Sequence, residues 1–394
     1  MRVGIDARIS RAWTTGVGTY TTNLLRGLAG GSSRHSYTLL CSPQAPAFPG
    51  GLPAGCDLVR CSTPVASLRQ QIFLGRTARR LGLEILLHTH PLAAAIWSRV
   101  PTVMVLLDVY PVLFPRDFPR GTALYYKTVV GLAGRCAASI IAISEATRRD
   151  ARDRLGIPES RVRVVPLAAH PGCRPLRGAP ELPRVLNRLG VPQPYILYHG
   201  NKRPHKNLSG LVRAYRRLIE RGADPPPLVV TGAENPAERD QDSRPLRAQL
   251  VELGLNTRVC FTGWVTEEDL PYVLSGAELL VMPSLYEGFG LPALEAMACG
   301  TPVVASNVGA VPEVVGQAAL LVDPTDTGAL ADAMRRVLAD GDLRADLAER
   351  GLARAAQFSW SGTAKATLEV LEAVAQRGRE GSGGQEKSAP RRYR

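Results

Sequence analysis

Short runs of apolar residues alternate along this chain with segments whose apolar positions recur every three or four residues. In the first half, apolar runs of strand length lie at residues 2–9, 36–40, 57–61, 84–88, 101–108, 138–144 and 161–167. Amphipathic segments predict helices between them at 18–30, 66–81, 121–136 and 144–156. This alternation predicts a parallel sheet whose crossover connections are helices.

A segment without apolar periodicity then interrupts the pattern at residues 168–185, which are rich in Pro, Gly and Arg. Beyond it the alternation restarts, with strands predicted at 195–200, 227–232, 258–263, 277–284, 301–306 and 318–323. A helix is predicted over 206–220, because apolar residues recur there with helical spacing at Leu208, Leu211, Val212, Tyr215, Leu218 and Ile219.

The pattern therefore predicts an α/β protein with two doubly wound, Rossmann-like sheets. We expect an N-terminal domain over residues 1–172, a linker over 173–190 and a C-terminal domain over 191–356. Two such sheets would face each other across a cleft at the carboxyl ends of their strands. Residues 377–394 are almost free of apolar side chains and predict a disordered tail.

Composition agrees with a globular protein of more than one domain. The chain has 394 residues, more than one core usually organises, and 45% of them are apolar. The first ten residues carry Arg2, Asp6 and Arg8 where a signal peptide needs an apolar core, and no apolar run approaches the ~18 residues of a membrane helix. We therefore expect a cytoplasmic protein. The seven cysteines lie without metal-ligand spacing, which predicts reduced thiols and no metal site.

The excess positive charge lies entirely in the first half of the chain. Residues 1–175 hold 22 Lys and Arg against 9 Asp and Glu, whereas residues 176–394 hold 26 of each. A basic domain can serve an anionic membrane surface, an acidic substrate or a nucleic acid, or can be a solvated arginine-rich surface. No helix-turn-helix, zinc-finger or aromatic RNA-binding motif accompanies the charge, so no nucleic acid partner is expected.

Two strand-to-helix turns could present backbone N–H groups to an anion. In "RISRAWTTGVGTY", Gly16 and Gly18 precede a predicted helix, but Thr21 occupies the place of the third glycine of a dinucleotide fingerprint. In "YHGNKRPHKNLSG", Lys202, Arg203, His205 and Lys206 crowd a helix start. Because a helix N-terminus already favours negative charge, a bound anion would make that arrangement favourable.

A third turn, "LYEGFGLPALEAMACGTPVVAS", brackets loop-forming residues with two carboxylates, Glu287 and Glu295. Gly288 and Gly290 permit close approach of the backbone to a ligand, and Pro292 suits the first turn of a helix. Glu295 could compensate the positive end of its own helix, but Glu287 precedes that helix.

These motifs resemble the retaining GT-B glycosyltransferases, in particular the bacterial group that includes mannosyltransferases of lipopolysaccharide and capsule assembly. "EGFGLPALE" looks like their signature of two glutamates separated by seven residues. The resemblance extends over residues 1–375 through "GVGTYTTNLLRGL", "ISEATRRDARDRLG", "YHGNKRPHKNLSG" and "FTGWVTEEDLPYVL". It also implies that a helix over 357–376 crosses back to the N-terminal domain.

The resemblance implies a role for each matching residue. Glu287 would hold hydroxyls of the donor sugar and Glu295 the nucleotide ribose, while Lys206 would contact the diphosphate. Gly16 and Gly18 would close over the diphosphate, and Val265 would flank the base. The loop of Gly288, Phe289, Gly290 and Leu291 would meet the sugar and the diphosphate with its backbone.

Two positions depart from the family pattern. Asn201 replaces an arginine, so either Arg203 or Lys202 must supply the second cation; we assign Arg203 as catalytic and Lys202 as donor-binding. Leu107 replaces a histidine that faces the sugar in the family, directly before Asp108, which is either a catalytic residue or a structural aspartate at a strand end. His88 and His90, on an earlier strand end, could partly substitute for that histidine.

The resemblance implies transfer of a hexosyl group, with mannosyl favoured, from a nucleotide-diphosphate sugar to a saccharide or lipid-linked acceptor. GDP-mannose is the favoured donor and UDP-sugars are the alternative. We expect no cofactor and no metal, because no DxD-like pair is evident in a metal-binding context. The basic first domain could dock on the anionic inner membrane leaflet. A glycosidase with two carboxylates and a noncatalytic, nucleotide-sugar-binding subunit are the competing hypotheses.

Overall fold

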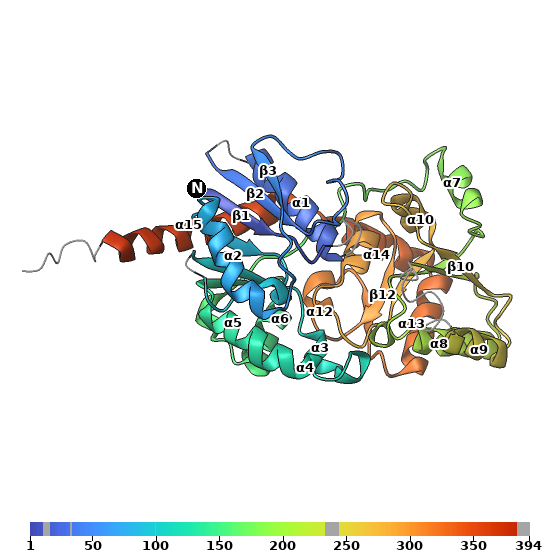
Figure 1. Cartoon of the computed structure of the whole chain (residues 1–394). Helices are drawn as coiled ribbons and strands as arrows, with labels where there is room; N and C mark the ends of the chain where they lie inside the picture. The colour runs from blue at the N-terminus through green and yellow to red at the C-terminus, as the bar shows by residue number, and fades with distance from the viewer. Residues whose placement is uncertain (11–15, 32–33, 99, 233–243, 384–394) are drawn as a thin grey trace, which may run out of the picture. The chain divides into compact units, whose positions relative to one another are not determined.

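The computed structural model describes residues 1–10, 16–31, 34–98, 100–232 and 244–383, and the chain divides into two compact units (Figure 1). The first unit comprises residues 1–167 and 360–394, and the second comprises residues 168–359. Each unit is built on one parallel sheet, as the alternating pattern predicts.

The first unit contains a seven-stranded sheet in the order β3-β2-β1-β4-β5-β6-β7. Asp6 and His88 are register partners at the ends of the two central strands. All seven predicted strands form, with bounds β1 (Arg2–Asp6), β2 (Ser36–Cys41), β3 (Cys56–Arg60), β4 (Ile85–His88), β5 (Thr102–Leu106), β6 (Ser139–Ala142) and β7 (Val162–Val164).

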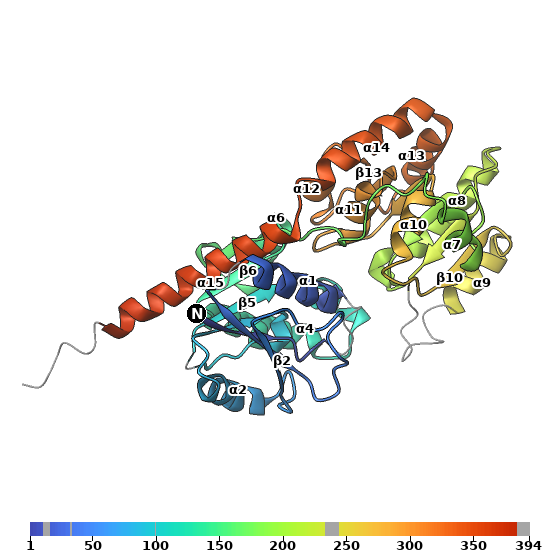
Figure 2. The same cartoon turned by 90° about the horizontal axis from the view of Figure 1, so that it is seen from above.

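The helices of the first unit are α1 (Gly16–Gly31), α2 (Leu68–Arg80), α3 (Tyr110–Leu113), α4 (Thr122–Tyr125), α5 (Gly131–Cys136), α6 (Glu145–Leu155) and α15 (Trp360–Gly383), with a π-helical stretch at Tyr126–Val130 and short 3₁₀ turns, among them η1 (Pro91–Ala93). The long α15 lies beside α1 in both views (Figures 1 and 2). A Cβ on Gly27 of α1 would come within 2.8 Å of Ala364, so a glycine permits this close packing. The helix extends past 377, where the sequence predicts a tail; residues 384–394 lie outside the described part.

The second unit contains a six-stranded parallel sheet in the order β10-β9-β8-β11-β12-β13. The six predicted strands form at β8 (Ile196–His199), β9 (Leu228–Thr231), β10 (Val259–Gly263), β11 (Leu279–Met282), β12 (Val303–Ser306) and β13 (Leu320–Val322). The helices are α7 (Leu182–Arg188), α8 (Leu208–Glu220), α9 (Arg244–Glu252), α10 (Leu270–Gly276), α11 (Leu291–Ala298), α12 (Val311–Val315), α13 (Thr327–Ala339) and α14 (Gly341–Ala355), with a 3₁₀ turn, η5 (Pro204–Lys206).

The apolar stripe predicted on α8 is its core-facing side. Leu211, Val212 and Tyr215 are fully buried against β8 and β9 in one apolar cluster. A difference from the sequence pattern lies at α7, which falls inside the segment predicted to be a linker. Its Leu182, Val185 and Leu186 are buried, so this segment belongs to the second unit. No helix of the described residues has the length and apolarity needed to cross a membrane.

Candidate functional site

Two loops at the carboxyl ends of adjacent strands are fastened together in the second unit. The turn after β8 and the loop after β11 meet where Leu285 N donates to the His205 carbonyl oxygen at 2.6 Å. Asn207, in the left-handed region at φ 54°, donates its side-chain amide to the Pro283 carbonyl at 3.1 Å and to the Pro324 carbonyl at 2.8 Å. These bonds bring together the basic turn and the first glutamate, 81 residues apart in the chain.

Lys206 and Glu287 form a buried ion pair at this junction. Lys206 Nζ lies 2.7 Å from Glu287 Oε1, and only 15% and 9% of the two side chains are exposed. Ser284 Oγ donates to the same carboxylate oxygen at 2.7 Å. The Lys206 ammonium group therefore compensates the negative charge of the Glu287 carboxylate.

The basic turn carries fewer positive charges than its sequence suggests. Burial, with help from nearby Lys206 and Arg203, lowers the pKa of His205 to about 3, so its ring is neutral at pH 7. Lys202 Nζ lies 5.0 Å from the centroid of the Phe261 ring, a cation–π contact. The Arg203 backbone N–H donates to Asn201 Oδ1 at 3.2 Å. Lys206 keeps its positive charge in contact with the Glu287 carboxylate.

The loop that opens α11 has the backbone geometry that the glycine pattern indicates. Gly290 is the residue before the helix and adopts φ 104°, a conformation that favours glycine. Phe289 turns its side chain into the protein, where it stacks edge-to-face on Phe358 at 5.9 Å between ring centroids. The Phe289 side chain is therefore not part of the exposed surface of this loop.

Gly309 also lies at this junction, although no motif of the sequence contains it. It adopts φ 58°, and a Cβ there would lie 2.5 Å from the Glu287 carbonyl oxygen. Ala310 N donates to that same oxygen at 3.0 Å. The segment after β12 therefore packs against the Glu287 backbone. The only feature of the sequence that could indicate this contact is a glycine shortly after a predicted strand.

Glu295 lies within α11 and is 8% exposed. Burial raises the pKa of its carboxyl group to about 7, although the nearby His170 ring and a hydrogen bond from the His170 backbone lower it. His170 is itself 3.5 Å from Glu267. The predicted ribose ligand is therefore a carboxyl group that titrates near neutral pH.

Val265 follows β10 and is 6% exposed, whereas its neighbour Trp264 is 49% exposed. The ends of β8, β9 and β10 are joined through glycine backbones: Gly200 N donates to the Thr231 carbonyl, and Gly232 N to the Gly263 carbonyl at 3.0 Å. A Cβ on Gly232 would lie 2.0 Å from the Gly200 carbonyl oxygen, so this junction accepts only glycine.

In the first unit, Gly16 and Gly18 lie within the first turn of α1, because the helix begins earlier than the sequence pattern indicates. Most of the preceding loop, residues 11–15, lies outside the described part of the chain. Asp108 follows β5, and its Oδ1 accepts a hydrogen bond from Tyr110 N at 3.0 Å. Leu107 beside it is partly buried, and its side chain has no hydrogen-bond donor.

The two histidines proposed to substitute for a histidine at position 107 have different environments in the structure. His88 is fully buried, and its Nδ1 lies 3.1 Å from Asp6 Oδ2. His90 is partly buried and accepts the Leu92 N–H on Nδ1 at 3.1 Å, which places its ring proton on Nε2. Burial lowers the pKa of His90 to about 4, so it is a neutral donor at pH 7.

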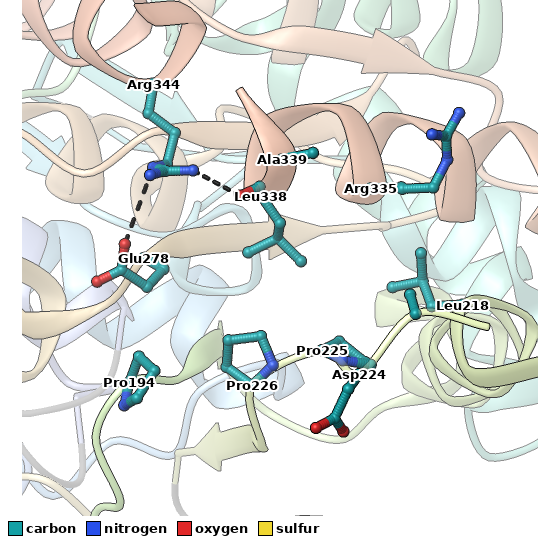
Figure 3. Close-up of a pocket in the computed structure, with 11 residues that line it drawn as sticks. Pro194, Leu218, Asp224, Pro225, Pro226, Glu278, Arg335, Leu338, Ala339 and Arg344 are labelled. Atoms are coloured by element: carbon teal, nitrogen blue, oxygen red, sulfur yellow. Dashed lines mark hydrogen bonds and ion pairs between the residues drawn. The ribbon is translucent and has the colours of Figure 1, made fainter. Parts of the chain in front are cut away.

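A pocket of about 470 Å³ lies at the opposite end of the second sheet (Figure 3). Pro194, Pro226 and Glu278, which line it, stand just before β8, β9 and β11, at the amino ends of these strands. Glu278 pairs with Arg344 at 3.9 Å and with Arg177 at 3.4 Å. This pocket is therefore remote from the loops described above. Among the described residues, no group of three potential ligands could hold a metal ion.

Two parallel-sheet α/β units, of seven and six strands, match the GT-B fold of glycosyltransferases. Family models agree: "Glycosyl transferases group 1" matches residues 186–354, and "Glycosyltransferase Family 4" matches residues 14–172. The chain belongs to these glycosyltransferase families.

Named relatives are consistent with this assignment. The chain is 36% identical over 259 residues to O-antigen chain mannosyltransferase B of Escherichia coli, covering 66% of each chain. It is 30% identical over 292 residues to the serotype-specific mannosyltransferase WbdA of Escherichia coli, covering 73% of this chain but only 35% of that protein. The Anabaena protein HepE, solved in complex with UDP-glucose, shares the fold with a TM-score of 0.73 and 21% identity, over 95% of this chain and 100% of that one.

Proposed function

We propose that this protein transfers a hexosyl group, with mannosyl favoured, from a nucleotide-diphosphate sugar to a saccharide or lipid-linked acceptor during assembly of a cell-surface polysaccharide. The observation that carries the proposal is the Lys206–Glu287 pair, held at the carboxyl end of the sheet beside the glycine loop of α11. Mannosyl is favoured because two similar proteins are mannosyltransferases. UDP-sugars are the alternative donors, because HepE, which shares the fold, was solved in complex with UDP-glucose.

In this proposal the transferred sugar retains its anomeric configuration. The acceptor hydroxyl oxygen bonds to the anomeric carbon as the bond from that carbon to the diphosphate breaks. The hydroxyl proton passes to the leaving diphosphate, on which negative charge develops in the transition state. Lys206 and backbone N–H groups of the Gly288–Leu291 loop stabilise that charge, with Arg203 or Lys202 as a further cation. Glu287 accepts hydrogen bonds from hydroxyls of the donor sugar. Asp108, Gly16 and Gly18, all in the first unit, keep the roles that the family resemblance implies as predictions.

The direct test incubates the purified protein with GDP-mannose, GDP-glucose, UDP-glucose and UDP-galactose, together with a lipid-linked saccharide acceptor. We expect transfer from one of them, with an α-linked product from an α-linked donor by NMR. A second candidate function is that of a noncatalytic subunit that binds nucleotide sugar, because Leu107 stands where the family has a histidine. Nucleotide-sugar binding without transfer from any donor would favour that candidate.

Transfer is expected to be independent of divalent metal. Lys206 supplies at the diphosphate the positive charge that a bound cation would otherwise provide. Initial rates with and without EDTA, after dialysis against a chelating resin, should agree within twofold. Strong inhibition by EDTA that Mg²⁺ or Mn²⁺ reverses would contradict the proposal.

Binding of GDP-mannose is expected to tighten about tenfold between pH 6 and pH 8. An ionised Glu295 can accept both ribose hydroxyls, and its pKa of about 7 makes the ionised fraction rise over this range. The donor itself has no group that titrates there, unlike free GDP. Calorimetric titrations of wild type and Glu295→Gln provide the test, since the variant should bind weakly and lose this pH dependence.

The same pKa predicts a stability change in the unliganded protein. The Glu295 carboxyl group titrates higher in the folded state than its ordinary value of 4.5, so the folded protein holds the extra proton between about pH 4.5 and 7. Its ionisation therefore destabilises the fold as the pH rises through this range. Because His170 and Glu267 face the same group, the pH dependence must be compared with that of Glu295→Gln.

A further inference from the structure

Two cysteines that are far apart in the sequence lie against each other in the second unit. Cys173 belongs to the segment that opens this unit, and Cys299 directly follows α11. Their thiols are hydrogen-bonded to each other. Cys299 is buried, whereas Cys173 is only partly buried, and both are free thiols in the structure. The pair is therefore a cluster of two nucleophilic groups that the proposed transfer of sugar does not use.

The segment that carries the first cysteine runs along the end of α11. Upstream of the pair, His170 donates its backbone N–H to the Glu295 carboxylate. Downstream of the pair, Pro175 and Gly300 meet, and a Cβ on Gly300 would lie 3.9 Å from Pro175 Cγ. The two segments thus contact each other in the same order on both sides of the thiols. The proximity of the thiols is therefore a consequence of how the two backbones pack.

The backbone around Cys173 is also held in place. Cys173 N donates to the His170 carbonyl oxygen at 2.8 Å, which closes a turn. Beyond the turn, Leu176 N donates to Ser275 Oγ at 3.0 Å, and Ser275 Oγ donates to the Arg174 carbonyl oxygen at 3.2 Å. Ser275 is a buried residue of α10. The residues after Cys173 are therefore anchored on a helix, and this cysteine is presented to Cys299 by an ordered turn.

We propose that Cys173 and Cys299 form a reversible disulfide that weakens binding of the donor. The oxidant is a low-molecular-weight disulfide. The Cys173 thiolate attacks one of its sulfur atoms and releases one small thiol. The Cys299 thiolate then bonds to Cys173 Sγ and displaces the second small thiol. The two protons of the protein thiols end on the two small thiols, and the oxidant takes up two electrons.

The effect on the donor follows from the position of the pair next to Glu295. A covalent S–S bond brings two sulfur atoms closer than a hydrogen bond does. Because the residues after Cys173 are anchored, the shift falls on the turn that begins at His170 or on the last turn of α11. Both elements position the Glu295 carboxyl group. The change in donor binding rests on the proposed function, in which Glu295 holds the ribose, but formation of the disulfide does not.

The environment of Cys173 makes this reaction slow and selective. The hydrogen bond with Cys299, burial and the charge of Glu295 raise the pKa of the Cys173 thiol, so little of it is thiolate at pH 7. Cys136 is the exposed cysteine of the first unit. A small alkylating reagent should therefore modify Cys136 well before Cys173. The bridge depends on a nearby second thiol rather than on an unusually reactive first one.

The test is incubation of the full chain with glutathione disulfide, followed by pepsin digestion at low pH, which prevents thiol exchange. Mass spectrometry should detect peptides joined through Cys173 and Cys299. Calorimetric titration with GDP-mannose should show binding about tenfold weaker after oxidation, the effect of one misplaced hydrogen-bonding group, and dithiothreitol should restore it.

Cys173→Ser and Cys299→Ala should each bind the donor as the reduced wild type does and lose the response to glutathione disulfide. Two variants are used because Cys299 is buried and its replacement can affect folding. The matched control is Cys260→Ser. Cys260 is a partly buried cysteine of the same unit, and its Sγ donates to the Gly190 carbonyl oxygen at 3.3 Å. This control should respond to oxidation as wild type does.

The outcomes separate this inference from the proposed function. Glutathione adducts without a bridge between Cys173 and Cys299 would overturn the inference, and so would a bridge that leaves the affinity for the donor unchanged. If the bridge forms but the reduced protein binds no nucleotide sugar, the proposed function fails and the disulfide stands. Normal donor binding and transfer by a protein that forms no bridge gives the reverse result.

Discussion

Replacing Lys206 by methionine is expected to lower the rate of sugar transfer by about 10²- to 10³-fold. The methionine keeps the length of the side chain but removes the ammonium group that lies 2.7 Å from Glu287. Removing one preorganised donor to a charge that develops in a transition state typically costs this much. The decrease should fall mainly on kcat, because the charge on the leaving diphosphate grows in the transition state.

The controls for Lys206→Met must separate catalysis from folding, since a buried Glu287 without its partner destabilises the protein. Thermal unfolding of Lys206→Met, Glu287→Gln and the double variant provides that separation: the double variant should recover part of the stability and none of the activity. Lys202→Met is the matched lysine in the same turn, and its contact with Phe261 predicts a smaller loss. A larger loss for Lys202→Met would assign the diphosphate contact to Lys202 instead.

The strands were predictable because parallel strands are covered on both faces and therefore read as continuous apolar runs. "PTVMVLLD" contains β5, whose five residues are all buried. The helix α7 was not predictable in the same way. It has only seven residues and lies between prolines and glycines, so its three buried apolar residues are too few to show a period.

The motifs of the candidate site could be predicted from the sequence, but the contacts between those motifs could not. Lys206 and Glu287 lie 81 residues apart, and their pairing depends on β8 and β11 being neighbours in the sheet. The role of Gly309 depends on the loop that packs against it, which no local pattern specifies. Burial raises the pKa of Glu295. The opposing effect comes from His170, on a segment that the sequence suggested to be the end of the other domain.

Replacing Asp6 by alanine is expected to lower the free energy of unfolding of the first unit by about 3–5 kcal/mol. Asp6 is fully buried at the end of β1 and accepts two bonds from the Arg8 guanidinium, both at 2.7 Å, and one from His88 at 3.1 Å. Its removal leaves Arg8, which is only 3% exposed, without its counter-charge. Asp57→Ala, an exposed aspartate on β3 of the same sheet, is the matched control and should change stability by less than about 0.5 kcal/mol.

The pH dependence of unfolding identifies the ionic origin of this loss. Burial alone would raise the pKa of Asp6, but the charge of Arg8 and the hydrogen bonds from Arg8 and His88 bring it well below its usual range. A carboxyl group whose pKa is lowered in the folded state contributes stability above its unfolded pKa of about 3.9, and that stability is lost as the pH falls. The difference in unfolding free energy between wild type and Asp6→Ala should therefore be constant from pH 8 to pH 5 and shrink below about pH 4. A difference that stays constant down to pH 3 would show that Asp6 acts through packing rather than charge.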